Sequence, residues 1–336
     1  GHLSGLHQSE TIGVSLDPTL PTSGTAASLF AAAVPDQPDV GFTGDFNGDG
    51  NADILWRNDA GMVQIWEMSG SQTLAAADVA TVSNSWHIVG IGDFNQDGRS
   101  DILWHGDNGV VGIWEMNGTQ IESMQTVGNV PNSWVVAGLG DFYGNGMSDI
   151  LWRSASGTVV LWQMNGAQVH AIQTIGVVPL NWHIVGIGDF DGNGTSDILW
   201  RNDGGEVLLW EMNGANVTAM QVVGVVDDSW HIEATADFGG GHKSDILWRN
   251  DSGQILIWEM NGAQIAVLQS VGNLGPAWQI AGTGDFNHDG KADILLRSDN
   301  GGTVLWEMNG PSVASISTVA SVGNDWKTET HHYDFV

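Results

Sequence analysis

Short apolar segments alternate with turns rich in Gly, Asn and Asp along most of this chain. In the unit that begins at residue 182, four such segments follow one another, at residues 182–190, 197–201, 206–212 and about 216–223. Their Val, Ile and Trp residues favour strands, and Asn213-Gly214 is a typical hairpin turn. The unit lacks the long 3.6-residue periodicity that predicts a helix. The pattern therefore predicts four short antiparallel strands.

This unit repeats every 48 residues without insertion or deletion. Asp-Phe pairs mark the repeats, beginning at Asp45, Asp93, Asp141, Asp189, Asp237 and Asp285. All 17 tryptophans fall into three series with the same spacing: Trp86, Trp134, Trp182, Trp230, Trp278 and Trp326; Trp66, Trp114, Trp162, Trp210, Trp258 and Trp306; and Trp56, Trp104, Trp152, Trp200 and Trp248, with Leu296 in the sixth copy. Four strands in a unit of this length are typical of a propeller blade. An open solenoid fits less well, because the strands return as a meander. We therefore expect an all-β protein, a β-propeller of four-stranded blades.

The number of blades depends on an unpaired strand. The second, third and fourth strands occur six times, whereas the first occurs seven times, because residues 41–46 open the first copy and residues 326–335 stand alone at the end. We expect a seven-bladed ring, in which residues 326–336 form the inner strand of the closing blade and residues 1–38 supply its other strands. The alternative is a six-bladed ring with residues 326–336 packed elsewhere. The propeller then comprises residues 39–336, and residues 1–38 are an N-terminal extension.

The charge balance narrows the choice of partners. The chain has 39 acidic and 9 basic residues, a net charge of −30, and no cysteine. Such a surface repels nucleic acid and anionic lipid and attracts cations. No apolar run approaches the roughly 20 residues that span a bilayer, so we expect no membrane insertion. The apolar cluster at residues 29–34 is too short for a signal peptide and lacks a basic flank, although the mature form of a secreted protein would look the same.

An acidic loop of nine residues joins the first and second strands of each unit. Its pattern is D-x-[DN]-x-[DN]-G-x-x-D, and the first copy runs from Asp45 to Asp53. Calcium takes roughly six to eight oxygen ligands; positions 1, 3, 5 and 9 can supply side-chain oxygens, and position 7 a backbone carbonyl. An EF-hand is excluded, because Ile-Leu-Trp follows the loop instead of a helix. Polar turns without metal are a poor explanation for six aligned copies.

The six loops differ in quality. The expected calcium ligands are Asp45, Asn47, Asp49, Asn51 and Asp53 in the first loop; Asp93, Asn95, Asp97, Arg99 and Asp101 in the second; Asp141, Asn145 and Asp149 in the third; Asp189, Asp191, Asn193, Thr195 and Asp197 in the fourth; and Asp285, Asn287, Asp289, Lys291 and Asp293 in the sixth. Tyr143 weakens the third loop. The fifth loop, with Gly239, Gly241 and His242, should bind nothing. We therefore expect about four or five structural Ca²⁺ ions, coupled to folding.

The end opposite these loops gathers a second set of residues. Alternating strand direction brings the Trp that opens each unit beside the Arg-Asn turn after the second strand. An indole ring stacks on the apolar face of a sugar, and Asn, Asp, Arg and His bond its hydroxyls. The candidate carbohydrate-binding residues are Trp86, His87, Trp134, Trp182, His183, Trp230, His231, Trp278, Arg57, Asn58, Arg201, Asn202, Arg249 and Asn250. We expect the Trp residues of the second and third strands to be core, whereas core packing and ligand stacking both stay open for the opening Trp.

The motifs F-x-G-D-G and D-F-N-x-D-G-x-x-D-I-L-W resemble FG-GAP/VCBS repeats, whose best-known relatives are the integrin α-subunit propellers. The form D-I-L-W-R-N…W-E-M-N-G is similar to tandem repeats of secreted bacterial proteins. The resemblance covers residues 41 to about 335. It implies a calcium-braced, usually seven-bladed propeller that works outside the cytoplasm, in adhesion or carbohydrate recognition more often than in catalysis.

These observations predict a binding protein rather than an enzyme. Repeated blades offer several similar sites, whereas a catalytic site needs a unique set of unlike residues. We expect a secreted or cell-surface, calcium-stabilised multivalent lectin whose partners are glycans or cell-surface polysaccharide. The alternative is a protein-binding adhesion or spacer module from a larger extracellular protein.

Overall fold

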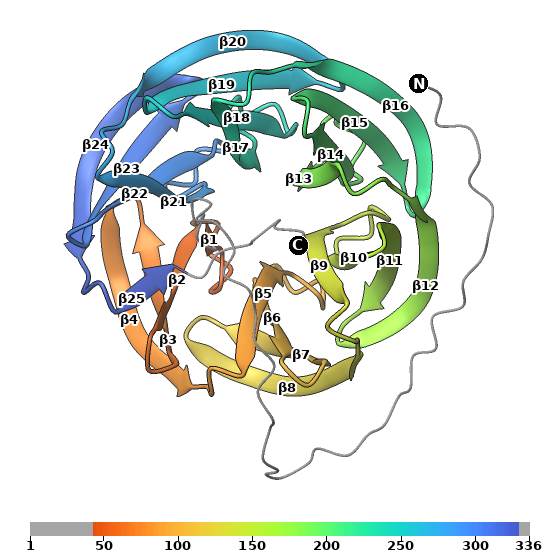
Figure 1. Ribbon diagram of the computed structural model, residues 1–336. Coiled ribbons are helices and arrows are strands. Elements are labelled where there is room, and N and C mark those ends of the chain that lie inside the picture. Colours follow the sequence, from red (N-terminus) through yellow and green to blue (C-terminus); the bar gives the residue numbers. More distant parts are fainter. Residues whose placement is uncertain (1–42, 329–336) are drawn as a thin grey trace.

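The computed structural model describes residues 43–328, and residues 1–42 and 329–336 lie outside the described part. The described chain forms 25 strands in six sheets, arranged as blades around a common axis (Figure 1). Each blade is a meander of four neighbouring antiparallel strands, so the expected β-propeller is confirmed. Between residues 43 and 328 no helix is long and apolar enough to cross a membrane.

The strands of each blade follow one another from the axis to the rim (Figure 1). The innermost strands are β1 (Thr43–Gly44), β5 (Trp86–Gly92), β9 (Trp134–Gly140), β13 (Trp182–Gly188), β17 (Trp230–Ala236) and β21 (Trp278–Gly284). The second strands are β2 (Asp53–Asn58), β6 (Asp101–Gly106), β10 (Asp149–Ser154), β14 (Asp197–Asn202), β18 (Asp245–Asn250) and β22 (Asp293–Ser298). The third strands are β3 (Met62–Ser69), β7 (Val110–Asn117), β11 (Thr158–Asn165), β15 (Glu206–Asn213), β19 (Gln254–Asn261) and β23 (Gly302–Asn309). The outer strands are β4 (Gln72–Thr81), β8 (Gln120–Asn129), β12 (Gln168–Val177), β16 (Asn216–Val225), β20 (Gln264–Asn273) and β24 (Ser312–Ser321). A last strand, β25, covers Trp326–Thr328.

The ring closes through an innermost strand built from both ends of the described chain. β25 pairs with the C-terminal half of β2, where Trp326 faces Asn58, and β1 pairs with the N-terminal half, where Gly44 faces Asp53. A continuous inner strand has the same register, because Trp182 faces Asn202 and Gly188 faces Asp197 in blade 4. The two pieces therefore act together as the inner strand of blade 1.

This closure corrects the expected blade count. The structure has six blades, the count of the alternative, and not the preferred seven. Residues 326–328 are not packed elsewhere, as that alternative supposed, but pair with β2 in the closing blade. The strand at residue 326 does not begin a seventh blade, because β1 is only two residues long and leaves half of the edge of β2 free for β25. Residues 1–38, which we expected to supply the rest of a seventh blade, lie outside the described residues.

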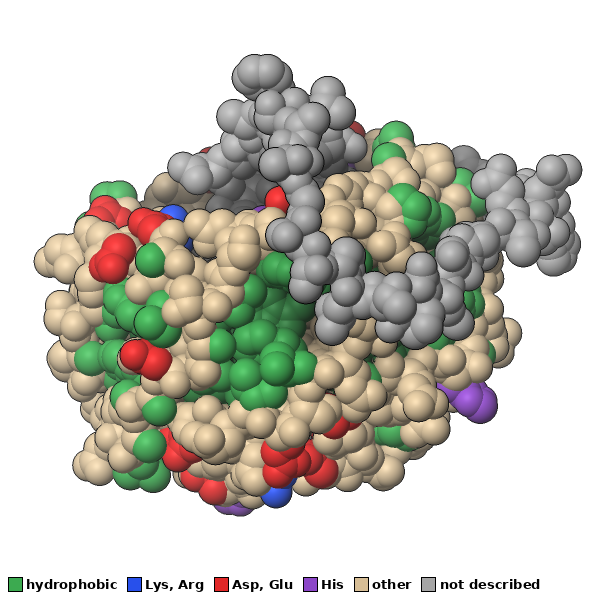
Figure 2. Space-filling model, turned by 90° about the horizontal axis from the view of Figure 1, so that it is seen from below, with side chains coloured by type: hydrophobic (Ala, Val, Ile, Leu, Met, Phe, Trp, Pro, Cys, Tyr) green, Lys and Arg blue, Asp and Glu red, His purple; other side chains and the backbone are tan. Residues whose placement is uncertain are grey.

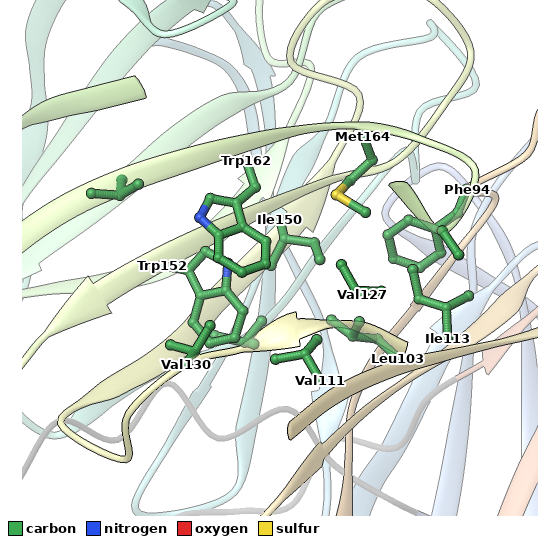
Figure 3. Packing of buried hydrophobic residues seen from close by; sticks show 13 residues of the cluster. Phe94, Leu103, Val111, Ile113, Val127, Val130, Ile150, Trp152, Trp162 and Met164 are labelled. Carbon is green, nitrogen blue, oxygen red and sulfur yellow. The ribbon is translucent and has the colours of Figure 1, made fainter. Parts of the chain in front are cut away.

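The hydrophobic core lies between the blades. Figure 3 shows one such cluster, in which Phe94 and Leu103 of blade 2 meet Trp152 and Met164 of blade 3. The described residues contain six clusters, one at each contact between neighbouring blades, and the contact between blades 6 and 1 is among them. Each fully buried large apolar side chain contributes about 1.5–3 kcal/mol, so every blade is stabilised mainly by its two neighbours.

The tryptophans divide by strand. All five on the second strands are fully buried, as expected, and each lies against the third-strand Trp of its own blade; the ring centroids of Trp104 and Trp114 are 4.7 Å apart. On the third strands, Trp162, Trp210 and Trp258 are buried as expected, whereas Trp66, Trp114 and Trp306 are partly exposed. The opening tryptophans are half-buried and pack against the inter-blade clusters.

Candidate functional site

The first aspartate of each acidic loop closes the loop. In blade 4, the Asp189 carboxylate accepts hydrogen bonds from the backbone N–H groups of Gly192, Asn193 and Gly194, at 2.7, 3.1 and 2.8 Å. Gly194 has a φ of +84°, which is the left-handed conformation that glycine adopts without strain. This accounts for the Gly at position 6 of the pattern.

Positions 3 and 5 of the blade 4 loop bring further oxygens together. The Oδ1 atoms of Asp191 and Asn193 each accept a hydrogen bond from the backbone N–H two residues further on, at 2.9 and 2.7 Å. Asp189, Asp191 and Asp197 offer carboxylate oxygens within 4.8 Å of one another, the one such group of three found among the described residues. Carboxylate and amide oxygens are the donors that Ca²⁺ prefers, so these side chains fit that ion.

The ninth residue of the loop has a second role that the sequence pattern did not reveal. Asp197 is fully buried, and its two oxygens accept hydrogen bonds from the backbone N–H groups of Phe190, at 3.0 Å, and Met212, at 2.8 Å. Burial raises the pKa of Asp197 to about 7; the two backbone hydrogen bonds lower the pKa, and Asp191 and Asp189 raise it further. The carboxylate therefore joins the acidic loop to the third strand of its blade.

Blade 5 separates the two roles. Its loop has Gly239 and Gly241 where the others have ligands, yet Asp245 still accepts hydrogen bonds from Phe238 and Met260, at 2.9 and 2.8 Å. Asp237 still closes the loop through the N–H groups of residues 240–242. The loop conformation therefore does not require the side chains at positions 3 and 5. A signal for the structural role was present in the sequence, because Asp245 persists where the ligands at positions 3 and 5 are lost.

The remaining predicted ligands sit in loops of the same shape. In the first, second, third and sixth loops, the first aspartate accepts hydrogen bonds from the N–H groups of positions 5 and 6. Arg99 Nη1 lies 3.3 Å from Asp97 Oδ2, and Lys291 Nζ donates to Asn309 Oδ1 at 2.8 Å, so these two cations lie beside the second and sixth loops. In the third loop, Tyr143 supplies no carboxylate or amide oxygen.

The acidic loops also connect neighbouring blades. The carbonyl oxygen of Asp189 accepts a hydrogen bond from Ser244 N in blade 5 at 2.6 Å, and that of Phe190 accepts one from Gly262 N at 2.8 Å. Equivalent bonds to the first aspartate occur at all six contacts, and the contact from Asp285 to Ala52 closes the ring. An ion held in a loop would therefore stiffen the contact between two blades.

At the opposite end, the arginines fasten each blade to the next. Arg153 is fully buried and donates hydrogen bonds to the carbonyl oxygens of Trp182, at 2.5 Å, and Pro179, at 3.1 Å, while its guanidinium lies 5.4 Å from the ring centroid of Trp200. Burial lowers the pKa of Arg153 to about 10, so the group stays charged at neutral pH. Arg57 and Arg201 make the same contacts with the next blade, which occupy donors that we expected to serve a sugar.

The asparagines of the candidate sugar site shape their own turns. Oδ1 of Asn202 accepts hydrogen bonds from the N–H groups of Gly204, at 3.0 Å, and Glu206, at 2.9 Å. Asn58 and Asn250 do the same in blades 1 and 5. The carbonyl oxygens of these side chains are therefore engaged within the protein, and the turn itself is what they stabilise.

The histidines that follow the opening Trp lie at the surface of this end; His87 is exposed, and His183 and His231 are partly exposed. His87, His183 and His231 pair with an aspartate of the neighbouring turn, with Nε2 to Oδ1 distances of 2.8, 2.7 and 2.8 Å. In blade 1, Lys327 of the closing strand takes the same place, and its Nζ lies 3.2 Å from Asp59. The structure thus brings each half-buried opening Trp beside an exposed polar pair in blades 2, 4 and 5.

Comparison with known protein families shows which family this chain resembles. A model of FG-GAP-like repeats matches residues 45–104, 93–152 and 141–200, and the FG-GAP repeat model matches residues 277–313, so the matches cover more than half of the chain. This chain belongs to the FG-GAP repeat family. No curated protein matches it. A solved structure described as "Crystal structure of BBS1N in complex with ARL6DN, soaked with mercury" is similar to this FG-GAP propeller over 85% of this chain and 82% of that one. The sequence identity is 12% and the TM-score is 0.45, and we infer nothing about function from this similarity.

Proposed function

We propose that this FG-GAP propeller is a non-catalytic binding module of the adhesion type, and that its end opposite the acidic loops meets a protein surface. The observation that carries the proposal is where the six repeats differ. The buried sequence Asp-Ile-Leu opens the second strand of every blade. The residue after the opening Trp instead varies, as Lys327, His87, Val135, His183, His231 and Gln279. A repeated framework with a varied exposed end suits one irregular partner surface better than a repeated small ligand.

We further propose that Ca²⁺ braces the ring. The support is the oxygen-rich donor set of the fourth loop and the hydrogen bonds that join every loop to the next blade. Ions would bind in the first, second, fourth and sixth loops, more weakly in the third, and not in the fifth. The proposed place of action is outside the cytoplasm, where calcium sites of extracellular modules work with dissociation constants on the order of 10⁻⁴–10⁻³ M.

Multivalent sugar binding is the second candidate. Three near-identical sets support it, each with a half-buried opening Trp and an exposed His-Asp pair, in blades 2, 4 and 5. Linked weak sites gain roughly 10²–10⁴ in apparent affinity on a surface that displays many copies of a sugar. The arginines and asparagines count against it, because their polar atoms are already bonded within the protein.

The test is to probe arrays of glycans and of purified extracellular proteins with the calcium-loaded chain. The protein-binding proposal predicts signal on proteins and silence across glycans. The sugar candidate predicts glycan signal that falls in the triple variant H87Q/H183Q/H231Q, whose melting temperature checks that it stays folded. His170→Gln, which changes an exposed histidine on the outer strand β12, is the matched control and should change neither signal. Silence on both arrays would contradict the proposal.

A further inference from the structure

One blade departs from the others on the end opposite the acidic loops. Where the other blades carry a polar or charged residue after the opening Trp, blade 3 has Val135, and where the other five carry an aspartate in the next turn, it has Ala155. The loop after its outer strand has Leu180 where blades 1, 2 and 6 have asparagine. The outer strand ends on Val177, where blade 4 also has valine and the other four blades have Thr, Asn or Ser. Several polar-to-apolar replacements thus fall on one end of one blade.

These residues form a continuous strip, which we call the blade 3 strip: Val135, Ala155, Leu180 and Val177. The first two positions lie side by side, since they hold the His-Asp contact of 2.7–2.8 Å in blades 2, 4 and 5. Leu180 follows, because its Cδ2 lies 3.5 Å from where a Cβ on Gly157 would stand, in the turn that contains Ala155. Val177 pairs with Thr158 at the end of that turn. The strip therefore crosses the blade from the innermost strand to the outermost.

The blade 3 strip is exposed rather than folded into the core. The exposed fractions are 37% for Val135, 43% for Val177 and 52% for Leu180, and Ala155 is also exposed. The apolar core of blade 3 is complete without them, because Trp152 and Trp162 fill the contact with blade 2 and Val178 packs towards blade 4. Apolar side chains also gather elsewhere on the molecule, as Figure 2 shows on the side of the ring, but only the strip replaces a polar pair that blades 2, 4 and 5 carry.

The surroundings of the strip limit what can cover it. Asp107 of blade 2 and Asp203 of blade 4, whose side chains are 66% and 67% exposed, flank it on either side. A second copy of this chain, with a net charge of −30, would be repelled there. A sugar would lose water from its hydroxyls against side chains that offer no hydrogen bond. An apolar segment with basic residues on both sides meets neither penalty.

We infer that the blade 3 strip is the docking surface for a partner protein segment that presents apolar side chains between flanking Lys or Arg residues. This rests on the proposed protein-binding function and names its place and its partner chemistry. Leu180 and Val135 bury their exposed apolar surface against the segment, and the carboxylates of the neighbouring blades pair with its cations at the rim.

The test uses random peptides displayed on phage, selected against the calcium-loaded full chain. The variant V135H/A155D/L180N gives blade 3 the residues that other blades carry at these positions, so it should fold as they do, which its melting temperature checks. The matched control, H231V/D251A, makes the same end of blade 5 apolar and leaves both the strip and its flanking carboxylates intact. We expect selected peptides to combine apolar with Lys or Arg residues, to lose about tenfold or more in affinity for the blade 3 variant, and to keep their affinity for the control.

Three results would overturn the inference. The first is the selection of acidic or purely polar peptides. The second is unchanged peptide affinity in a folded blade 3 variant, which would leave the binding module standing with its site on another blade. The third is failure to enrich any apolar and basic peptide. The proposed binding-module function is tested separately: it would be contradicted if neither the protein array nor the glycan array gave a signal.

Discussion

Replacing Arg201 by Met separates a fastening role from a sugar-binding role. In the structure, Arg201 donates to the carbonyl oxygens of Trp230 and Asp227, the latter at 3.0 Å, and its guanidinium lies 5.5 Å from the ring centroid of Trp248. The change also loses a third hydrogen bond, to the carbonyl oxygen of Val226 at 3.2 Å. Hydrogen bonds from a charged donor are worth about 1.5–3 kcal/mol each, and the lost cation–π contact about 0.5–2 kcal/mol. Relief from burying the cation offsets part of this, so we expect a net loss of about 2–4 kcal/mol.

The matched control is Arg249→Met in blade 5. There the next blade offers Leu296 instead of a Trp ring, and no hydrogen bond of Arg249 is found among the described residues. The nearby Glu233 carboxylate is protonated below its pKa of about 7, so at about pH 5.5 losing the Arg249 cation leaves no ionised group unpaired. We expect a cost below about 1 kcal/mol for this control.

Urea unfolding in calcium gives both free energies. The account requires Arg201→Met to lower the free energy of unfolding by clearly more than Arg249→Met. If Arg201→Met leaves the unfolding free energy unchanged and removes binding to a glycan surface, the arginine is a ligand contact and the fastening role is wrong.

Three further changes test other parts of the account. Glu233 is 5% exposed, and burial raises its pKa to about 7, so ionisation of Glu233 lowers the stability of the fold as pH rises from about 4.5 to 7. Replacing Glu233 by Val should therefore raise the free energy of unfolding by roughly 3 kcal/mol at pH 8 and by little at pH 5. Equal gains at both pH values in urea unfolding would contradict this. Deleting residues 326–336 removes β25 and should broaden or abolish the cooperative unfolding transition. The control Lys327→Ala breaks one exposed ion pair and should cost less than about 1 kcal/mol. A truncated chain with an unchanged calorimetric transition would contradict the closure of blade 1 by β1 and β25 together. Replacing Asp191 and Asn193 by Gly copies the fifth loop into the fourth, and calorimetric titration should then find one Ca²⁺ fewer; an unchanged count would exclude these residues as ligands.

Much of the fold follows from local pattern. The fourth strand predicted near residues 216–223 is β16, and the second strand predicted at 197–201 is β14, because alternation of Val, Ile and Trp with Asn-Gly turns fixes hairpins locally. Blade number does not follow locally. It depends on Trp326 facing Asn58, a pairing between residues far apart in the sequence.

The sequence predicted where the candidate site residues lie, but not what their side chains bind. Strand direction correctly placed Arg201 and Trp182 at the end opposite the acidic loops. It did not show that the backbone carbonyls of the next loop converge on the guanidinium, because backbone acceptors leave no mark in the sequence. The same reason hid the bonds of Asp197, whose partners lie seven residues before and fifteen residues after it.

The effect of calcium on thermal unfolding tests whether Ca²⁺ braces the contacts between blades. Each site filled at about 100 times its dissociation constant adds about 2.7 kcal/mol to the folded state, and the loops pass this to the contacts between blades. The account predicts that chelator-treated protein melts many degrees below protein saturated with Ca²⁺, and that added Ca²⁺ restores the transition. An identical melting temperature with chelator and with saturating Ca²⁺ would contradict the claim that calcium braces this ring.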